Sequence, residues 1–121
     1  MISVPAFLLR RLYVKGSLKN TANGFAFQLQ NSLGSGYAKE MLPLTLNGQE
    51  IPLETASFSL DGQVTPFSEV NEEKPFTLPM NKSILIEVKG KTLEPKPHKV
   101  GMAFVVSGLG KLSFDVTDTP A

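Results

Sequence analysis

The chain has 121 residues, of which 41% are apolar and 19% are charged, and 12 basic against 11 acidic residues give a net charge of +1. This composition is too hydrophobic for a disordered chain, and its charge gives no overall field that would attract nucleic acid or an anionic membrane. There is no cysteine and a single histidine, which excludes disulfides, thiolate metal sites and any metal site with two histidines from this chain. We expect one domain over residues 1–121.

Apolar residues alternate with polar residues along most of the chain, which is the period of a β-strand. No long window shows the i, i+3, i+4, i+7 spacing of an amphipathic helix. The first run is the least regular, but Tyr13, Val14 and Gly16 favour a strand there. In chain order the pattern predicts strands over about residues 7–18, 24–33, 41–47, 50–54, 57–61, 64–67, 83–89, 99–106 and 111–117. The sequence therefore predicts an all-β fold, a two-layer antiparallel β-sandwich of about eight or nine short strands.

Turn residues support this interpretation. Asn47-Gly48 and Asp61-Gly62 each separate two predicted strands, and such dipeptides accept the positive φ angles of tight hairpins. Proline has no N–H to donate to a sheet, so Pro52, Pro66 and Pro75 predict edge or bulged strands.

Charge is segregated along the chain. Residues 1–39 carry five basic residues and no acid, residues 40–73 carry seven acids and no base, and residues 74–111 carry seven lysines and two acids. The blocks could face two different partners. They could also lie side by side in the sheets as pairs of opposite charge, which is the interpretation we favour.

The residues offer little catalytic chemistry. No serine lies in a nucleophile motif, and we predict no catalytic residue, no cofactor and no metal site. His98 is the most interesting residue, as an acid, a base or one ligand of a metal shared with another subunit. It could instead be structural, at the start of a strand, with its ring capping the end of the sandwich or hydrogen-bonded to a loop carbonyl. The candidate ligand or interface residues are His98, Glu94, Arg10 and Arg11, and one of the two arginines is expected to point inward.

Four landmarks resemble a known family. Gly24–Leu29, Leu44–Pro52, Phe58–Gly62 and Leu93–Val100 are similar to segments of the small β subunit of bacterial C-glycoside deglycosidases. The resemblance implies a β-sandwich that assembles with a larger barrel subunit, which carries a divalent metal and cleaves a carbon–carbon bond between a sugar-derived unit and an aromatic ring. Pro97 stands where that family has glycine before the histidine, so no catalytic residue is carried over.

A second resemblance concerns the start of the chain. The run from Phe7 to Leu18 is similar to small proteins labelled hydroxymethylglutaryl-CoA reductase. A nicotinamide-dependent reductase needs a dinucleotide site and a channel for CoA, and a strand-rich chain without a glycine–helix fingerprint supplies neither. We therefore set that label aside.

These observations favour a non-catalytic or accessory subunit that assembles with a larger, metal-dependent enzyme subunit. The alternative is a homo-oligomeric module that binds a small carbohydrate or related metabolite near His98, Glu94 and residues 68–82. A third possibility is an autonomous enzyme that uses His98.

Partners are expected at a sheet face or edge, as a larger enzyme subunit or a second copy of the chain. Ala103–Val106 and the pair Leu8-Leu9 are the docking candidates, because both put apolar residues on two faces of a strand. The apolar run at Ala6–Leu9 is interrupted at once by Arg10-Arg11, too short for a signal peptide or a membrane span. A cytoplasmic protein that binds neither nucleic acid nor membrane is expected.

Overall fold

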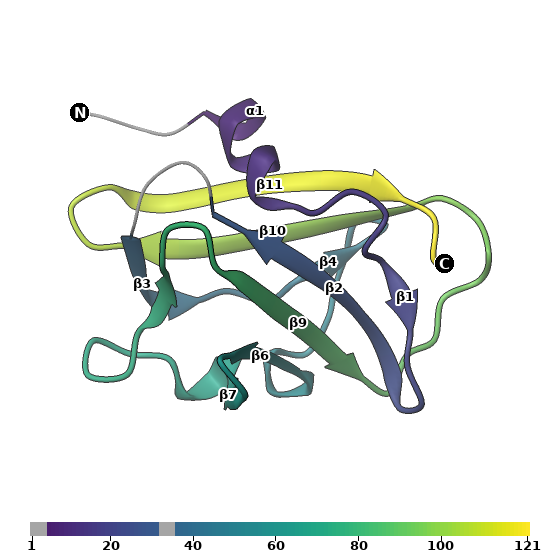
Figure 1. Ribbon diagram of the computed structural model, residues 1–121, viewed down its shortest axis with the longest axis horizontal. Coiled ribbons are helices and arrows are strands. Elements are labelled where there is room, and N and C mark those ends of the chain that lie inside the picture. Colours follow the sequence, from purple (N-terminus) through teal and green to yellow (C-terminus); the bar gives the residue numbers. More distant parts are fainter. Residues whose placement is uncertain (1–4, 32–35) are drawn as a thin grey trace.

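The computed structural model describes residues 5–31 and 36–121, which form two antiparallel sheets packed face to face (Figure 1). The five-stranded sheet has the order β1 (Lys19–Asn20), β2 (Gly24–Gln30), β9 (Ser83–Lys89), β6 (Ala56–Leu60) and β7 (Gln63–Pro66). The six-stranded sheet has the order β5 (Gln49–Glu50), β4 (Thr45–Leu46), β10 (His98–Val106), β3 (Gly36–Met41) and β8 (Phe76–Leu78), and β11 (Gly110–Asp118) pairs with β10.

The predicted all-β sandwich is confirmed, with more strands than expected. The described residues contain eleven strands rather than eight or nine, because β1, β8 and most of β3 were not predicted. β8 lies inside the segment 68–82, which was expected to be a polar connection. Its three residues alternate buried, exposed and buried, and so short a run shows no clear period in the sequence. The predicted strand 24–33 ends at residue 30, and residues 32 and 33 lie outside the described part of the chain.

The prediction of a strand over residues 7–18 is wrong. The segment begins with the short helix α1 (Ala6–Leu9) and the 3₁₀ turn η1 (Arg10–Leu12), and an extended stretch bridged to β2 at Tyr13 follows. Leu9 and Leu12 are buried and lie three residues apart, which is a helical spacing, but one turn is too short to show a period in the sequence. In the described residues, no helix is long and apolar enough to cross a membrane.

Both predicted hairpin turns are confirmed. Asn47 and Gly48 have φ angles of 53° and 88°, and Asp61 and Gly62 have 52° and 83°, as a two-residue turn with the twist of a hairpin requires. The expectation for proline also holds at Pro66, which lies in the edge strand β7. Two further 3₁₀ turns, η2 (Leu53–Thr55) and η3 (Phe67–Glu69), follow Pro52 and Pro66.

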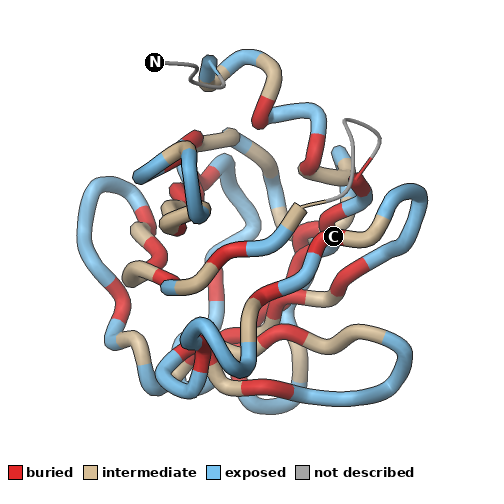
Figure 2. Tube along the Cα trace, turned by 90° about the vertical axis from the view of Figure 1, so that its left-hand side faces the viewer, coloured by how far each residue is buried: buried red, intermediate tan, exposed pale blue. Residues whose placement is uncertain are grey.

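The core lies between the two sheets. Buried residues alternate with exposed ones along the strands, which gives the banded pattern in Figure 2. Phe76 of β8 crosses from one sheet to the other, with its ring centroid 4.7 Å from that of Phe58 on β6 and 6.1 Å from that of Phe104 on β10. These edge-to-face contacts tie the sheets together at the end of the sandwich that holds β8.

Replacement of Phe76 by alanine should therefore destabilise the fold strongly. We expect a loss of about 3–5 kcal/mol in the free energy of unfolding, because the fully buried ring contacts both sheets and would leave a cavity. Urea denaturation measures this loss, and Phe76→Leu should show a smaller one. Thr77→Ala, on the exposed face of the same strand, should stay within about 0.5 kcal/mol of the natural protein. Equal losses for Phe76→Ala and Thr77→Ala would contradict the prediction.

Candidate functional site

The N-terminal segment covers the seam between the two sheets. η1 contacts both β2 of one sheet and β11 of the other, and α1 lies over β11 (Figure 1). Arg10 fastens this segment: its Nε donates to the backbone oxygen of Asp115 at 2.8 Å, and its Nη2 lies 3.6 Å from Asp115 Oδ1. A backbone carbonyl on the edge strand β11 is thereby satisfied, which discourages pairing of that position with another strand.

Beside Arg10, the outer face of the six-stranded sheet is hollowed into a basin of about 330 Å³. Its floor includes three small residues, Gly101 and Ala103 of β10 and Ser113 of β11. In the pairing of the two strands, Ala103 lies opposite Ser113 and Gly101 lies opposite Asp115. A Cβ at Gly101 would collide with Oγ1 of Thr45 on β4, so glycine is required for that close approach. The full lining is Ala6, Arg10, Pro43, Thr45, Gly101, Met102, Ala103, Lys111, Ser113, Phe114 and Asp115.

Tyr13 and Asp118 form a second fastening at the far end of β11. Tyr13 Oη donates to Asp118 Oδ2 at 2.6 Å, and the backbone N–H of Gly16 donates to the same oxygen at 2.9 Å. The Tyr13 ring also packs against Phe27, with centroids 5.8 Å apart. The two residues are 105 positions apart in sequence, so this contact joins the two ends of the chain.

The environment of this pair shifts both pKa values away from their ordinary ranges. Burial raises the pKa of Tyr13, and the hydrogen bond to Asp118 raises it further. Burial alone would raise the pKa of Asp118, but hydrogen bonds from Tyr13 and from backbone N–H groups outweigh it, so the pKa of Asp118 is lowered. The native pair is thus a neutral phenol that donates to a carboxylate.

His98 is buried, and both of its ring nitrogens have partners. Nε2 lies 3.0 Å from the backbone oxygen of Glu94, and Nδ1 lies 3.0 Å from Nδ2 of Asn47. The Glu94 carboxylate points elsewhere and pairs with Lys96 Nζ at 3.2 Å. The structural alternative for His98, a ring bonded to a loop carbonyl at the start of a strand, describes this geometry.

The sequence-predicted site residues lie in two separate places. His98 and Glu94 meet at one end of β10, whereas Arg10 and Arg11 lie in η1 beside β11, and both arginines are exposed. The expectation that one arginine points inward is therefore wrong, because these residues lie in a helical turn rather than a strand. In the described residues, no group of three or more histidine, cysteine, aspartate or glutamate side chains is placed to hold a metal ion.

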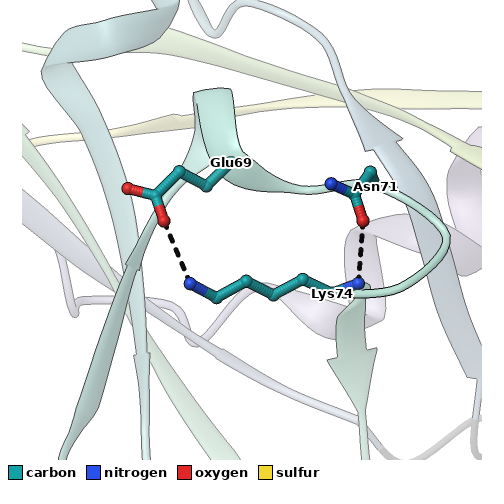
Figure 3. Close-up of polar contacts among 3 residues, drawn as sticks. All are labelled: Glu69, Asn71 and Lys74. Atoms are coloured by element: carbon teal, nitrogen blue, oxygen red, sulfur yellow. Dashed lines mark hydrogen bonds and ion pairs between the residues drawn. The ribbon is translucent and has the colours of Figure 1, made fainter.

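Residues 68–82 lie at the opposite end of the sandwich from His98. β8 pairs with β3, which joins β10 at residues 104–106, whereas His98 begins β10 (Figure 1). The segment is held by its own contacts: Lys74 Nζ pairs with Glu69 Oε1 at 3.0 Å, and the Lys74 backbone N–H donates to Asn71 Oδ1 at 2.9 Å (Figure 3). A single ligand surface formed by His98, Glu94 and this segment is therefore not present in the described structure.

The segregated charges meet in space. Lys39 of the first basic block lies 4.0 Å from Glu72 of the acidic block, and Lys82 of the last block lies 3.1 Å from Asp61. These pairs are exposed and add little stability. Each involves at least one residue in a turn or loop, so they are not the cross-strand pairs within the sheets that the sequence led us to expect.

Sequence reasoning missed Tyr13, Asp118 and the bonding role of Asn47. The turn at Asn47 was predicted, but its side-chain partner was not. Tyr13 and Asp118 carry no local signal, because their contact depends on how the two chain ends meet.

The family model described as hydroxymethylglutaryl-CoA reductase, N-terminal domain, matches residues 8–120, which include both sheets and most of the N-terminal segment. The chain belongs to this family. A comparison with the curated proteins finds no match.

This family membership overturns three expectations. The resemblance to the small β subunit of C-glycoside deglycosidases is not supported. The assignment as an accessory subunit of such a metal-dependent enzyme rested on that resemblance and is wrong as well. The alternative of a carbohydrate-binding module is not supported either. The similarity of Phe7–Leu18 to proteins with the reductase label, which we set aside, indicated the right family. The landmarks misled because hairpin turns and alternating strands recur in many β-sandwiches.

The residues described here lack the fingerprint of the doubly wound dinucleotide-binding fold. In that fold the cofactor is held where a glycine-rich turn after a strand opens a helix, with its pyrophosphate at the helix N-terminus. In the described residues the one α-helix, α1, has four residues and follows Pro5 rather than a strand and a glycine turn. We therefore derive no hydride-transfer step on this chain.

The Tyr13–Asp118 fastening should make stability depend on pH in a defined direction. Because the pKa of Asp118 is lower than its ordinary value of 3.8, its contribution is present above that value and is lost as the pH falls through the folded-state pKa. Because the pKa of Tyr13 is raised, its contribution is present below 10.0 and is lost at higher pH.

Tyr13→Phe keeps the ring against Phe27 and should cost about 1 kcal/mol near neutral pH, because one hydrogen bond to a carboxylate is lost. Chemical denaturation at a series of pH values measures both effects. Asp118→Asn should lose less stability than the natural protein between neutral and strongly acid pH, whereas the exposed Asp61→Asn should follow the natural protein. A Tyr13→Phe protein as stable as the natural one at every pH would contradict this assignment.

Proposed function

We propose that this β-sandwich is a non-catalytic N-terminal domain of a hydroxymethylglutaryl-CoA reductase that docks onto the catalytic part of that enzyme. The observation that carries the proposal is the family match, which extends over the whole sandwich rather than over one motif. The use of the polar side chains agrees with it. His98, Tyr13 and Asp118 are engaged in contacts that hold segments of the fold together.

The basin on the outer face of β10 and β11 is the surface we assign to docking. Its floor of small residues lets another chain approach the sheet closely, and Ala6 and Pro43 add apolar walls. Phe7 on α1 is 63% exposed and precedes the helical turn that carries Arg10. A large exposed aromatic residue next to a shallow apolar surface is a typical anchor of a protein interface.

The two docking candidates from the sequence have different places in this assignment. Ala103 lines the basin and Val105 lies farther along the same face, so part of Ala103–Val106 is retained. Leu9 is buried in the core and Leu8 is half-buried, so Phe7 replaces that pair. We also propose a cytoplasmic location, which the lack of cysteine supports.

The proposal predicts that a charge placed in the basin weakens docking. Ala103→Glu should reduce the affinity for the catalytic part of the host's reductase by at least about tenfold, because the longer side chain would project from the floor of small residues and its carboxylate would lose water on docking. The measurement is native mass spectrometry and calorimetry on the chain and on the catalytic part of the host's reductase, prepared without this domain. Thr77→Glu, on the exposed face of β8 in the same sheet, is the matched control and should bind like the natural chain.

Two results would overturn the proposal. One is a natural chain that binds no part of the reductase under conditions in which both are folded. The other is a chain that associates only with a second copy of itself, which would assign the basin to self-association.

A further inference from the structure

The side chains of His98 and Asn47 form a clip whose hydrogen-bond polarity follows from the geometry. His98, the first residue of β10, is 5% exposed. Its Nε2 lies 3.0 Å from the backbone oxygen of Glu94. A carbonyl oxygen can only accept, so Nε2 carries the hydrogen and donates. In a neutral ring, Nδ1 is then an acceptor.

The orientation of Asn47 is determined independently. Its Oδ1 accepts the backbone N–H of Lys99 at 2.9 Å, so its amide group Nδ2 must be the atom that faces His98 Nδ1, 3.0 Å away. Rotation of the amide by half a turn would break the bond to Lys99. The backbone N–H of Asn47 also donates to the Lys99 oxygen at 2.8 Å. The clip therefore requires an unprotonated Nδ1.

This clip joins two segments beside the pairing of β4 with β10, which ends at Leu46 and Val100. Asn47 is in the turn between β4 and β5, and Glu94 is in the connection from β9 to β10. The contacts of His98 thus hold these two segments against each other at the start of β10.

Few charges on the surrounding elements are free to stabilise a protonated His98. Asp118 lies opposite His98 in the pairing of β10 with β11, but its Oδ2 already accepts from Tyr13 and Gly16. The Glu94 carboxylate pairs with Lys96. Other charged residues on the adjoining elements include Lys99 on β10, Lys111 and Asp115 on β11, Glu50 on β5, Lys19 on β1, Lys89 at the end of β9 and Lys91 just after it.

We propose that His98 and Asn47 form a proton-operated latch that fastens the β4–β5 turn to the residue 91–97 connection and releases the Asn47 side chain in mildly acid solution. Imidazole is the side chain that gains its proton in this range. A proton on Nδ1 places an N–H directly against the N–H of Asn47, so attraction becomes repulsion and the Asn47 side chain must leave. The Lys99 N–H then loses its acceptor, while the backbone bond from the Asn47 N–H to the Lys99 oxygen and the pairing of β4 with β10 remain.

The sharpest test is Asn47→Asp, because it should reverse the sign of the effect. An aspartate keeps an oxygen for the Lys99 N–H and replaces the donor that faces His98 by an acceptor, which a protonated ring can bond. Aspartate also tolerates the positive φ of this turn. The matched control is Asn71→Asp, which makes the same change at a turn at the other end of the sandwich, where Asn71 Oδ1 accepts two backbone N–H groups (Figure 3).

Amide hydrogen exchange, measured by NMR and corrected for intrinsic rates, reports on the latch at Lys99. Between about pH 7.5 and about pH 5.5, protection of the Lys99 amide should fall by several-fold, up to about tenfold, in the natural protein and in Asn71→Asp, because uptake of one imidazole proton limits the change. In Asn47→Asp it should hold or rise as the pH falls. The Ile86 amide at the centre of β9 should not change, which separates opening of the latch from global unfolding.

His98→Gln provides a second test, because a glutamine cannot take up a proton. The pH dependence at Lys99 should disappear in this variant even if its stability is lower. Equal protection of Lys99 at both pH values in the natural protein would overturn the proposal, as would the same acid loss in Asn47→Asp as in Asn71→Asp. None of these readouts depends on a reductase, so failure of the latch and failure of the docking proposal are distinguishable.

Discussion

The contact of the two sheets through Phe58, Phe76 and Phe104 is the constraint on which the rest of the structure depends. Each sheet has one apolar face, and neither face can remain in water at a reasonable cost. The aromatic rings join β6, β8 and β10 across the interior, so the sheets cannot slide without breaking edge-to-face contacts. Once the two faces are packed together, the edges between the two sheets are the parts of the sandwich that other segments can cover.

One seam is covered by the N-terminal segment, and this covering creates the candidate docking surface. η1 lies between β2 and β11, and Arg10 and Tyr13 attach it to the last strand of the chain. The same segment supplies the wall of the basin through Ala6 and Arg10 and carries the exposed Phe7. Stability and interface are therefore coupled: loosening the attachment to β11 would also remove part of the surface assigned to docking.

His98 is a polar residue whose side chain holds segments of the fold together. A lone histidine at the start of an apolar strand invites a catalytic hypothesis, but both nitrogens are engaged in contacts with neighbouring segments. Because those contacts depend on an unprotonated nitrogen, a structural histidine can still respond to its surroundings.

The sequence by itself determined the fold class, because a period of two over many short runs can bury one face of each strand only in a layered β structure. It also determined the hairpins at Asn47-Gly48 and Asp61-Gly62, where the turn residues select the backbone conformation. The short strands β1 and β8 escaped prediction because two or three residues carry no period. The opening helix was not predicted because the buried residues Leu9 and Leu12 span only one helical turn.

Tertiary structure alone decided that Tyr13 meets Asp118, that Asn47 faces His98, and that small residues on β10 and β11 form a basin beside Arg10. Those contacts join residues far apart in the chain, and their positions follow from sheet order and register, which local residue patterns do not encode.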